Sequence, residues 1–546
     1  MKRSHLLQAL LGAALLPAFI TATAFATDPA VKVSVIAMEG QAVAGVGNIT
    51  SIDNVAVNNL GETLVEVDTD NPLTDVDGAM LRNGTLYIQE GQGLTLPAGA
   101  SVGSFDTVNL NNLGNSGWNF FLDGTAGTND DSGIFLNTSL LVQEGSIATA
   151  PQFAPGTPFL GFFECKINDA DQILVLGTVD DPAIATTVDQ FLMTLDTFGN
   201  QSVYLKEGDQ VPGAPGVFVS AFGTTPHNFD YSNAGDVLCF IDSDAATTVD
   251  GFIVKNGTII AREGDPAPVI GRNWSSLASP ELSLNDQGGY VFSGSLDGDA
   301  ATNLIIVRNG EKFRQEGDTL PAFAPFLITS FGTAPILAAN ATPAESFFDV
   351  FWYAAWDDPD TTKDTGLFLD EKLLLQEGVD KLGGIEIEDL RGIQDGYAIS
   401  DDGRYLVVRV SLVGSIDAAA LLDMGPWENL GHSLAGTTTP KLRCFGQLAP
   451  SEPVTLRLSN ALPGAFSALF FGLTQANQPF RGGILVPTPQ ILVYPLPVNA
   501  DGVLELTANW PPAAPAGVAI YLQYWVADPG APAGYAASNA VVGVSQ

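Results

Sequence analysis

The sequence is poor in cysteine, in histidine and in basic residues. Its 546 residues include three cysteines (Cys165, Cys239 and Cys444) and three histidines. We therefore expect small buried thiols, rather than a disulfide framework or a Cys165–Cys239 bridge. Lys and Arg number 22 against 61 Asp and Glu, which gives a formal net charge of −39. A chain this acidic is not expected to bind nucleic acid.

Long apolar runs are lacking beyond the N-terminus. Lys2 and Arg3 precede an apolar stretch that ends at Ala24-Phe25-Ala26, the pattern of a cleaved signal peptide over residues 1–26. We expect a secreted or surface-displayed protein without a membrane span, because no later run reaches the length of a spanning helix.

Apolar residues with helical periodicity are also lacking, which favours an all-β chain. Instead, a short apolar strand ending in Glu-Gly recurs every 51 to 63 residues, and this period predicts blade-like repeats. The pairs begin at Glu39, Glu90, Glu144, Glu207, Glu263, Glu316 and Glu377. Asn-Gly turns such as Asn83-Gly84, together with Asn- and Asp-rich turns such as 58–61, predict antiparallel hairpins within each repeat.

The two ends of the repeat array complement each other. The strand over residues 31–40 precedes the first complete repeat, and the last repeat, over residues 385–422, lacks a fourth strand. A seven-bladed β-propeller closed by the N-terminal strand accounts for both the extra strand and the missing one, and it leaves no sheet edge open. We expect this propeller over residues 27–424, a linker over 425–440, a β-sandwich over 441–546, and a monomer.

The repeated Glu-Gly has a structural and a functional interpretation. Glycine permits the left-handed backbone that a crossing between blades needs, and the carboxylate can accept backbone N–H groups there. A ring of seven functional carboxylates is the alternative. We favour the structural role, because chemistry usually needs one asymmetric group of residues.

The loops between the second and third strands of the repeats are acidic and are predicted to share one rim. Closely spaced Asp oxygens suit Ca²⁺, although solvated turns are the other interpretation. The best candidate ligands are Asp68, Asp70, Asp75, Asp77, Asp242, Asp244 and Asp250.

Few other residues suggest chemistry. Trp356, at the end of an aromatic-rich strand, is a candidate platform for a sugar, with packing between blades as the alternative. The segment around Ser433 differs from a nucleophile elbow, and only His227 and His432 would remain as imidazole bases after export. His227 is interpreted as a hydrogen-bonded loop residue. The sequence therefore indicates no catalytic residues.

Two parts of the sequence resemble bacterial protein families, and the family that the repeats resemble is uncharacterised. The Glu-Gly-Asp and Asn-Asp-x-Gly repeats resemble an exported tandem-repeat family. The segments "PFRGGILVPTP" (479–489) and "YLQYWVAD" (521–528) resemble a C-terminal module found in many secreted bacterial proteins. These resemblances imply export and supply no catalytic residues.

Two function classes follow. The first is an extracellular binding or scaffold protein whose acidic rim recognises a carbohydrate or a protein. The alternative is a Ca²⁺-dependent propeller hydrolase acting on sugar, lactone or phosphate esters, which requires carboxylates converging near the central channel.

Overall fold

The computed structural model describes residues 30–184, 189–224, 227–277, 280–333, 335–341, 348–390 and 394–546. The predicted signal peptide, residues 1–26, lies outside the described residues. The chain forms two compact units. The repeat unit comprises residues 34–340 and 349–421, and the C-terminal unit comprises residues 422–546 with the described parts of 1–33 and 341–348.

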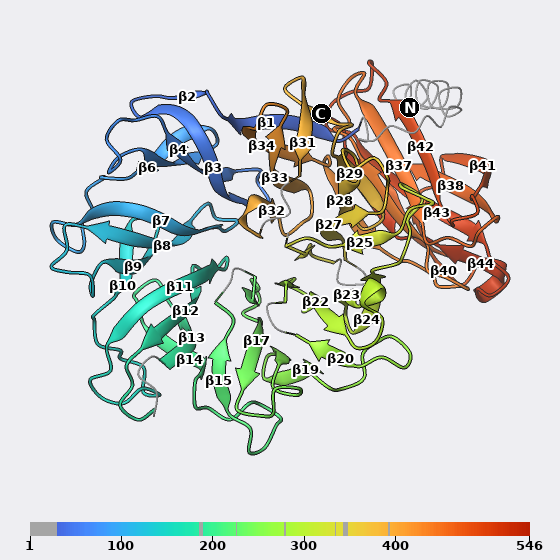
Figure 1. The fold of residues 1–546 in the computed structure, drawn as a ribbon. Helices are drawn as coiled ribbons and strands as arrows, with labels where there is room; N and C mark the ends of the chain where they lie inside the picture. The colour runs from blue at the N-terminus through green and yellow to red at the C-terminus, as the bar shows by residue number, and fades with distance from the viewer. Residues whose placement is uncertain are drawn as a thin grey trace. The chain divides into compact units, whose positions relative to one another are not determined.

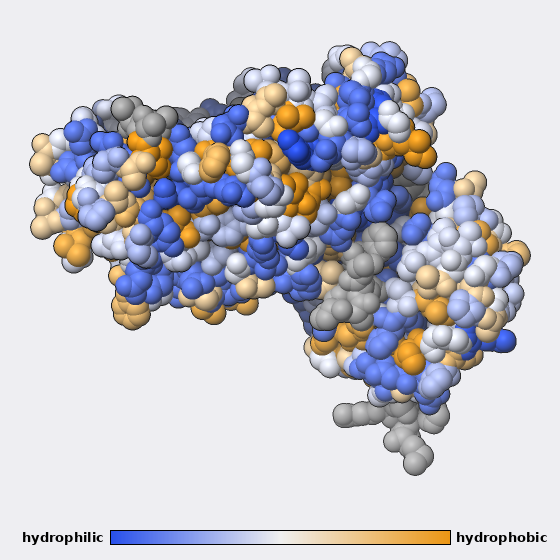
Figure 2. Space-filling view, turned by 90° about the horizontal axis from the view of Figure 1, so that it is seen from below, coloured by the Kyte–Doolittle hydropathy of each residue, from blue (hydrophilic) through white to orange (hydrophobic). Residues whose placement is uncertain are grey.

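The fold is all-β, as predicted. Within the described ranges the only helical elements are three short 3-10 turns, η1 (Ala300–Thr302), η2 (Gln394–Gly396) and η3 (Pro532–Gly534). None of the described helices has the length and hydropathy to span a membrane. Hydrophilic residues cover most of the face seen in Figure 2, where hydrophobic residues form small, separate patches.

The repeat unit contains a succession of antiparallel sheets, seven within the described residues, and Figure 1 shows them following one another around a ring. The first three sheets contain β2 (Ala42–Val43), β3 (Gly47–Val57), β4 (Thr63–Thr69), β5 (Gly78–Arg82) and β6 (Thr85–Gln89); β7 (Ser101–Leu110), β8 (Ser116–Asp123), β9 (Ser132–Leu136) and β10 (Ser139–Gln143); and β11 (Phe159–Ile167), β12 (Ile173–Val179), β13 (Asp189–Leu195) and β14 (Gln201–Lys206).

In the fourth to sixth sheets the first strand is divided into two segments. Their strands are β15 (Val219–Phe222), β16 (Phe229–Tyr231), β17 (Val237–Ser243), β18 (Phe252–Lys255) and β19 (Thr258–Arg262); β20 (Trp274–Ser276), β21 (Leu282–Leu284), β22 (Tyr290–Leu296), β23 (Leu304–Arg308) and β24 (Glu311–Gln315); and β25 (Ile328–Ser330), β26 (Leu337–Ala338), β27 (Val350–Trp356), β28 (Thr365–Leu369) and β29 (Lys372–Gln376).

The seventh sheet joins the two ends of the repeat array. It contains β30 (Lys381–Leu382), β31 (Ile385–Asp389), β32 (Tyr397–Ile399), β33 (Tyr405–Leu412) and β34 (Ile416–Asp423), and β1 (Lys32–Met38) pairs with β34 at its edge. The backbone N–H of Glu39 continues this pairing by donating to the Asp417 carbonyl at 2.8 Å. The N-terminal strand therefore lies beside the stretch near residue 420, as the sequence predicts.

The core of the repeat unit lies between consecutive sheets. Every residue of β12 is buried. Leu174 and Leu176 pack with side chains of the fourth sheet such as Phe229, whereas Ile173 and Val175 pack with Ile134 of the second sheet. A strand covered on both faces must be apolar at successive positions, which explains why β12 lacks alternation.

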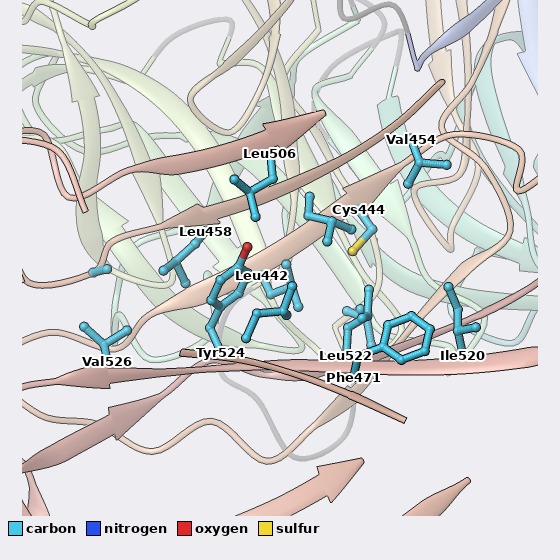
Figure 3. Close-up of a cluster of buried hydrophobic side chains, with 14 of the residues drawn as sticks. Leu442, Cys444, Val454, Leu458, Phe471, Leu506, Ile520, Leu522, Tyr524 and Val526 are labelled. Carbon is cyan, nitrogen blue, oxygen red and sulfur yellow. The ribbon is translucent and has the colours of Figure 1, made fainter. Parts of the chain in front are cut away.

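The C-terminal unit contains a six-stranded and a three-stranded sheet, with a separate hairpin. The first contains β35 (Trp427–Gly431), β38 (Phe466–Gly472), β41 (Ile491–Pro497), β43 (Ala519–Ala527), β44 (Tyr535–Ala537) and β45 (Ala540–Val544); the second contains β36 (Lys441–Phe445), β37 (Pro453–Ser459) and β42 (Leu504–Asn509); and the hairpin pairs β39 (Gln475–Phe480) with β40 (Gly483–Pro487). Side chains from both sheets form one buried cluster that includes Cys444, Leu506 and Tyr524 (Figure 3).

All three cysteines are free and buried. Burial raises the pKa of Cys165 and of Cys239 to about 12, which keeps both as unreactive thiols. The structure thus agrees with the expectation of small buried thiols.

Candidate functional site

Asparagine side chains connect the turns between first and second strands to one another. Asn58 Oδ1 accepts the backbone N–H groups of Leu60 and Glu62, both at 3.0 Å. Its Nδ2 donates to the Asn111 carbonyl in the next turn, and Asn111 Nδ2 donates to the Asn168 carbonyl, again at 3.0 Å in each case. The same side chain therefore forms a turn and joins two sheets, which explains its recurrence.

The following residue of each turn forms a closed ring of hydrogen bonds. The backbone N–H of each of the first five members donates to the side-chain oxygen of the next, starting with Asn59 to Asn112 at 2.9 Å. The members are Asn59, Asn112, Asp169, Asn233, Asp286, Asn340 and Asp401. At the seventh turn, Asn340 N–H donates to the Asp401 carbonyl, and Asp402 N–H donates to Asn59 Oδ1 at 2.9 Å, so the ring closes.

Asp401 departs from the other members of this ring. Its Oδ2 accepts hydrogen bonds from the Nδ2 atoms of Asn112 and Asn233, both at 2.7 Å, although neither is its neighbour in the ring. Burial, with the nearby Asp286 carboxylate, raises the pKa of Asp401 to about 6. The Asp401 carboxylate thus braces the interior of the ring.

The repeated Glu-Gly pairs have the structural role expected of them. All seven glutamates accept a hydrogen bond near the start of the neighbouring strand in the sheet. Five accept a backbone N–H, as Glu90 does from Gly78 at 2.8 Å, and two accept a hydroxyl, as Glu377 does from Thr365 at 2.6 Å. The glycines that follow have φ between 64° and 83°, and each donates its N–H to the next sheet, as Gly91 does to Val102 at 2.7 Å.

Most of the predicted calcium ligands make hydrogen bonds within the protein. In the first loop, Asp68 accepts from Ser51 Oγ at 2.8 Å and Asp70 accepts from Asn48 N and Nδ2, which lower the pKa of Asp70. Asp75 is exposed, and the Asp77 carbonyl accepts from Thr69 Oγ1 at 3.0 Å.

In the other acidic loop, Asp242 accepts from Ser243 N at 2.9 Å and Asp244 accepts from Phe218 N at 2.8 Å. Asp250 lies beside Glu263. Across the parts of the chain that the structure describes, no three His, Cys, Asp or Glu side chains form a group that could hold a metal ion. Calcium in these loops remains a prediction.

Trp356 corrects one expectation. Its side chain is 2% exposed and stacks on Phe323, with ring centroids 4.7 Å apart and an interplanar angle of 3°. Phe368 packs against its edge. The ring therefore serves the core between sheets, which is the packing alternative, and offers no platform to a sugar.

Two cavities of the repeat unit share lining residues. The wide cavity, of about 540 Å³, reaches Asp131 and Glu144 near the Glu-Gly crossings. The narrow cavity, of about 190 Å³, reaches the ring member Asp401. Both are lined by Asn54, Thr107, Glu164 and Asp395. They are therefore consecutive parts of one channel along the first strands of the sheets.

Besides Asp131 and Glu144, three carboxyl groups line the wide cavity: those of Asp106 in β7, Glu164 in β11 and Asp395 in η2. Burial raises the pKa of Asp106 to about 6, although Asn119 Nδ2 donates to this carboxyl group at 2.8 Å. Burial also raises the pKa of Glu164 to about 7, and the nearby Asp395 and Asp106 add to this effect. The pKa of Asp395 is raised by desolvation as well. The group Asp106, Glu164 and Asp395 is called the carboxyl triad below.

A lysine lies beside the triad, deeper in the channel. Lys166 Nζ is 3.5 Å from Glu164 Oε1. Burial lowers the pKa of Lys166, but the carboxylates of Glu164 and Asp230 outweigh this effect and leave it above its ordinary value. Lys166 is therefore a fixed cation within an acidic channel, and it cannot serve as a neutral nucleophile near pH 7.

β-Bulges turn the residues of the wide cavity toward the channel. The strand register shifts between Phe105 and Thr107 in β7 and between Phe162 and Glu164 in β11. Asp106 and Phe163 are the unpaired residues of these bulges, and each stands five residues before its turn asparagine, Asn111 or Asn168. A bulge frees a side chain from the alternation of a strand, so successive residues can line one cavity.

Sequence reasoning anticipated acidic rim loops but missed the triad. Asp106 and Glu164 stand singly in apolar strands, and Asp395 lies almost 300 residues from Asp106. The sequence does contain a pattern that could have indicated these residues. When the first strands are aligned on their turn residues, acidic side chains recur five residues before the turn, at a position expected to face a neighbouring sheet. His227 lies at this aligned position and lines the narrow cavity, with φ of 65°.

Residues 14–233, less than half of the chain, match a family of unknown function, DUF7453. No curated protein matches the sequence. Similar solved structures include a Penicillium chrysogenum α-L-arabinanase complexed with arabinobiose (10% identity, 72% of this chain and 97% of that chain, TM-score 0.26) and the Trypanosoma rangeli sialidase (9% identity, 94% and 96%, TM-score 0.30). Likeness at these TM-scores carries no functional inference.

Proposed function

We propose that the protein is an exported binding protein, built as a seven-bladed β-propeller with a C-terminal β-sandwich, that captures cationic ligands in its acidic channel. The succession of sheets, the pairing of β1 with β34 and the closed turn ring support the propeller. The two sheets around one buried cluster support the sandwich.

The convergence of Asp106, Glu164 and Asp395 on one cavity carries the proposal. Carboxyl groups that are partly desolvated and close to one another repel when ionised, and a bound cation relieves that repulsion. The net charge of −39 also raises the local concentration of cations near the channel. Both effects favour a cationic ligand over a neutral or anionic one.

Calorimetric titration of the mature chain tests this function. Small ammonium and guanidinium compounds, neutral sugars and carboxylic acids are titrated at low and at high salt. We expect the cations to bind most tightly and to weaken with added salt. The double variant Asp106→Asn/Glu164→Gln should weaken cation binding at least tenfold. Equal binding of neutral sugars, or cation binding unchanged in the double variant, would refute the proposal.

A hydrolase is the second candidate, because a carboxyl group with a pKa of about 7 can act as a general acid near neutral pH. Glu164 is that group, with Asp106 or Asp395 as the partner carboxylate. In this version Ca²⁺ in the acidic loops orders the rim. Turnover of a panel of glycosides, lactones and phosphate esters that is lost both in Glu164→Gln and on chelation would favour this candidate over simple binding.

A further inference from the structure

We propose that the wide cavity takes an organic ammonium ion that carries a flat apolar group, such as an arylalkylamine. This inference rests on the proposed function and specifies its ligand. Its basis is the pairing of apolar side chains with the carboxyl triad in one cavity.

Three apolar side chains line the same cavity as the triad and remain accessible. Phe121 is 43% exposed, and Leu160 and Phe163 are each 38% exposed. Single exposed apolar residues are ordinary on a protein surface. Three of them in one cavity form an apolar surface, and covering it with an apolar ligand contributes favourably to the free energy of binding.

These apolar residues break the repeat. Counted back from the turn asparagines, Phe163 occupies the position that holds Asp53 and Asp106 in the two preceding sheets. Leu160 occupies the position of Thr50 and Gly103. Packing between sheets does not require large apolar groups at these positions, because the preceding sheets do without them. The third sheet is therefore adapted locally, where Glu164 and Lys166 also lie.

Charge complementarity decides the polar part of the ligand. Lys166 lies near Glu164 and Asp230, so it offsets part of the negative charge in the deeper channel. Asp395 also lies near Lys166 and Arg409. At Asp106, in contrast, the donor is the neutral amide of Asn119, at 2.8 Å. An ammonium group placed between these carboxyl groups would gain charge-assisted hydrogen bonds.

The volume of the cavity and its apolar lining determine the rest of the proposed ligand. About 540 Å³ lies within the range of small-molecule sites, roughly 300 to 1,000 Å³. A hydrated metal ion would leave the phenyl groups in contact with water, and a linear polyamine would not cover them. An aromatic ring can pack on Phe121 and Phe163 while its ammonium group reaches the triad.

Three matched probes test this inference on the mature full-length chain by calorimetry at low ionic strength. 2-Phenylethylamine has both groups, ethylamine lacks the ring, and 2-phenylethanol lacks the charge. We expect 2-phenylethylamine to bind at least tenfold more tightly than either partial probe.

Variants then separate the two parts of the site. Phe163→Asp, which introduces the residue of the preceding sheets, should weaken 2-phenylethylamine at least tenfold and leave ethylamine unchanged or tighter. Glu164→Gln should weaken both amines. Phe198→Ser is the matched control, because Phe198 is 87% exposed and does not line the cavity; it should change neither affinity.

The outcomes distinguish this inference from the proposed function. If ethylamine binds as tightly as 2-phenylethylamine and Phe163→Asp has no effect, the apolar part is wrong and cation capture stands. If neither amine binds, both proposals are wrong. Equal binding of 2-phenylethanol would show a purely apolar site and would also overturn both.

Discussion

Replacing Glu164 by glutamine should stabilise the protein above neutral pH. The side chain is buried, with the residue 4% exposed, and its pKa rises from 4.5 to about 7 mainly because of burial. One pKa unit corresponds to about 1.4 kcal/mol, so ionising Glu164 costs the folded state about 3 kcal/mol. This figure already includes the attraction of Lys166, which opposes the shift.

The sign follows from proton binding. The folded protein holds the Glu164 proton more tightly than the unfolded chain does. Its stabilising contribution is therefore complete below pH 4.5 and is lost as the pH rises through about 7. Glutamine is neutral throughout, so Glu164→Gln should match the natural protein at pH 4 and exceed its stability at pH 8.

Thermal unfolding by calorimetry across pH 4 to 8 measures this difference. With an unfolding entropy of roughly 2.1 cal/mol/K per residue, 3 kcal/mol corresponds to a rise of about 4 °C in the Tm of a unit of several hundred residues. Glu62→Gln is the opposite control: hydrogen bonds from Asn58 and Arg82 outweigh burial and lower the pKa of Glu62, so its loss should destabilise the protein at neutral pH. A lower Tm for Glu164→Gln at pH 8 would refute this reasoning, because it would mean that the ion pair with Lys166 stabilises the folded protein more than the burial of ionised Glu164 destabilises it.

Three further predictions concern the ring, the crossings and the thiols. Asp401→Ala should lower the free energy of unfolding by about 1–3 kcal/mol, because it leaves amide hydrogens of Asn112 and Asn233 without their acceptor. An unchanged midpoint of unfolding in urea would show that these two hydrogen bonds do not stabilise the ring. Gly91→Ala should destabilise the protein by about 1–3 kcal/mol, since φ is 74° and a Cβ would meet Val76 Cγ1 at 2.5 Å, whereas Gly93→Ala, with nothing within 4 Å, should be neutral. Native protein should show no thiol reactive toward a colorimetric disulfide reagent and three after denaturation; rapid reaction of the native protein would contradict the burial of all three.

The sequence alone determined the local chemistry of this protein. Asn83 has φ of 50° in the hairpin turn expected of Asn-Gly, and the glycine of every Glu-Gly pair adopts the left-handed backbone. Such features depend on residues within a few positions of each other, so their spacing in the sequence is sufficient evidence. The pairing of β1 with β34 was also predictable, because an unpaired strand at one end and a missing strand at the other are complementary.

Only the tertiary structure decided which side chains meet. Asn112 and Asp401 lie 289 residues apart and share a hydrogen bond, and the triad joins residues of β7, β11 and η2. The bulge at Phe163 also changes which residues of β11 face the channel, and alternation along a strand cannot reveal this. Trp356 looked accessible in the sequence because an acidic loop follows it, yet its ring faces are covered by side chains such as Phe323, which lies in a different segment of the chain. Contacts between distant segments depend on strand register and on how neighbouring sheets pack. No single stretch of the sequence determines either of these.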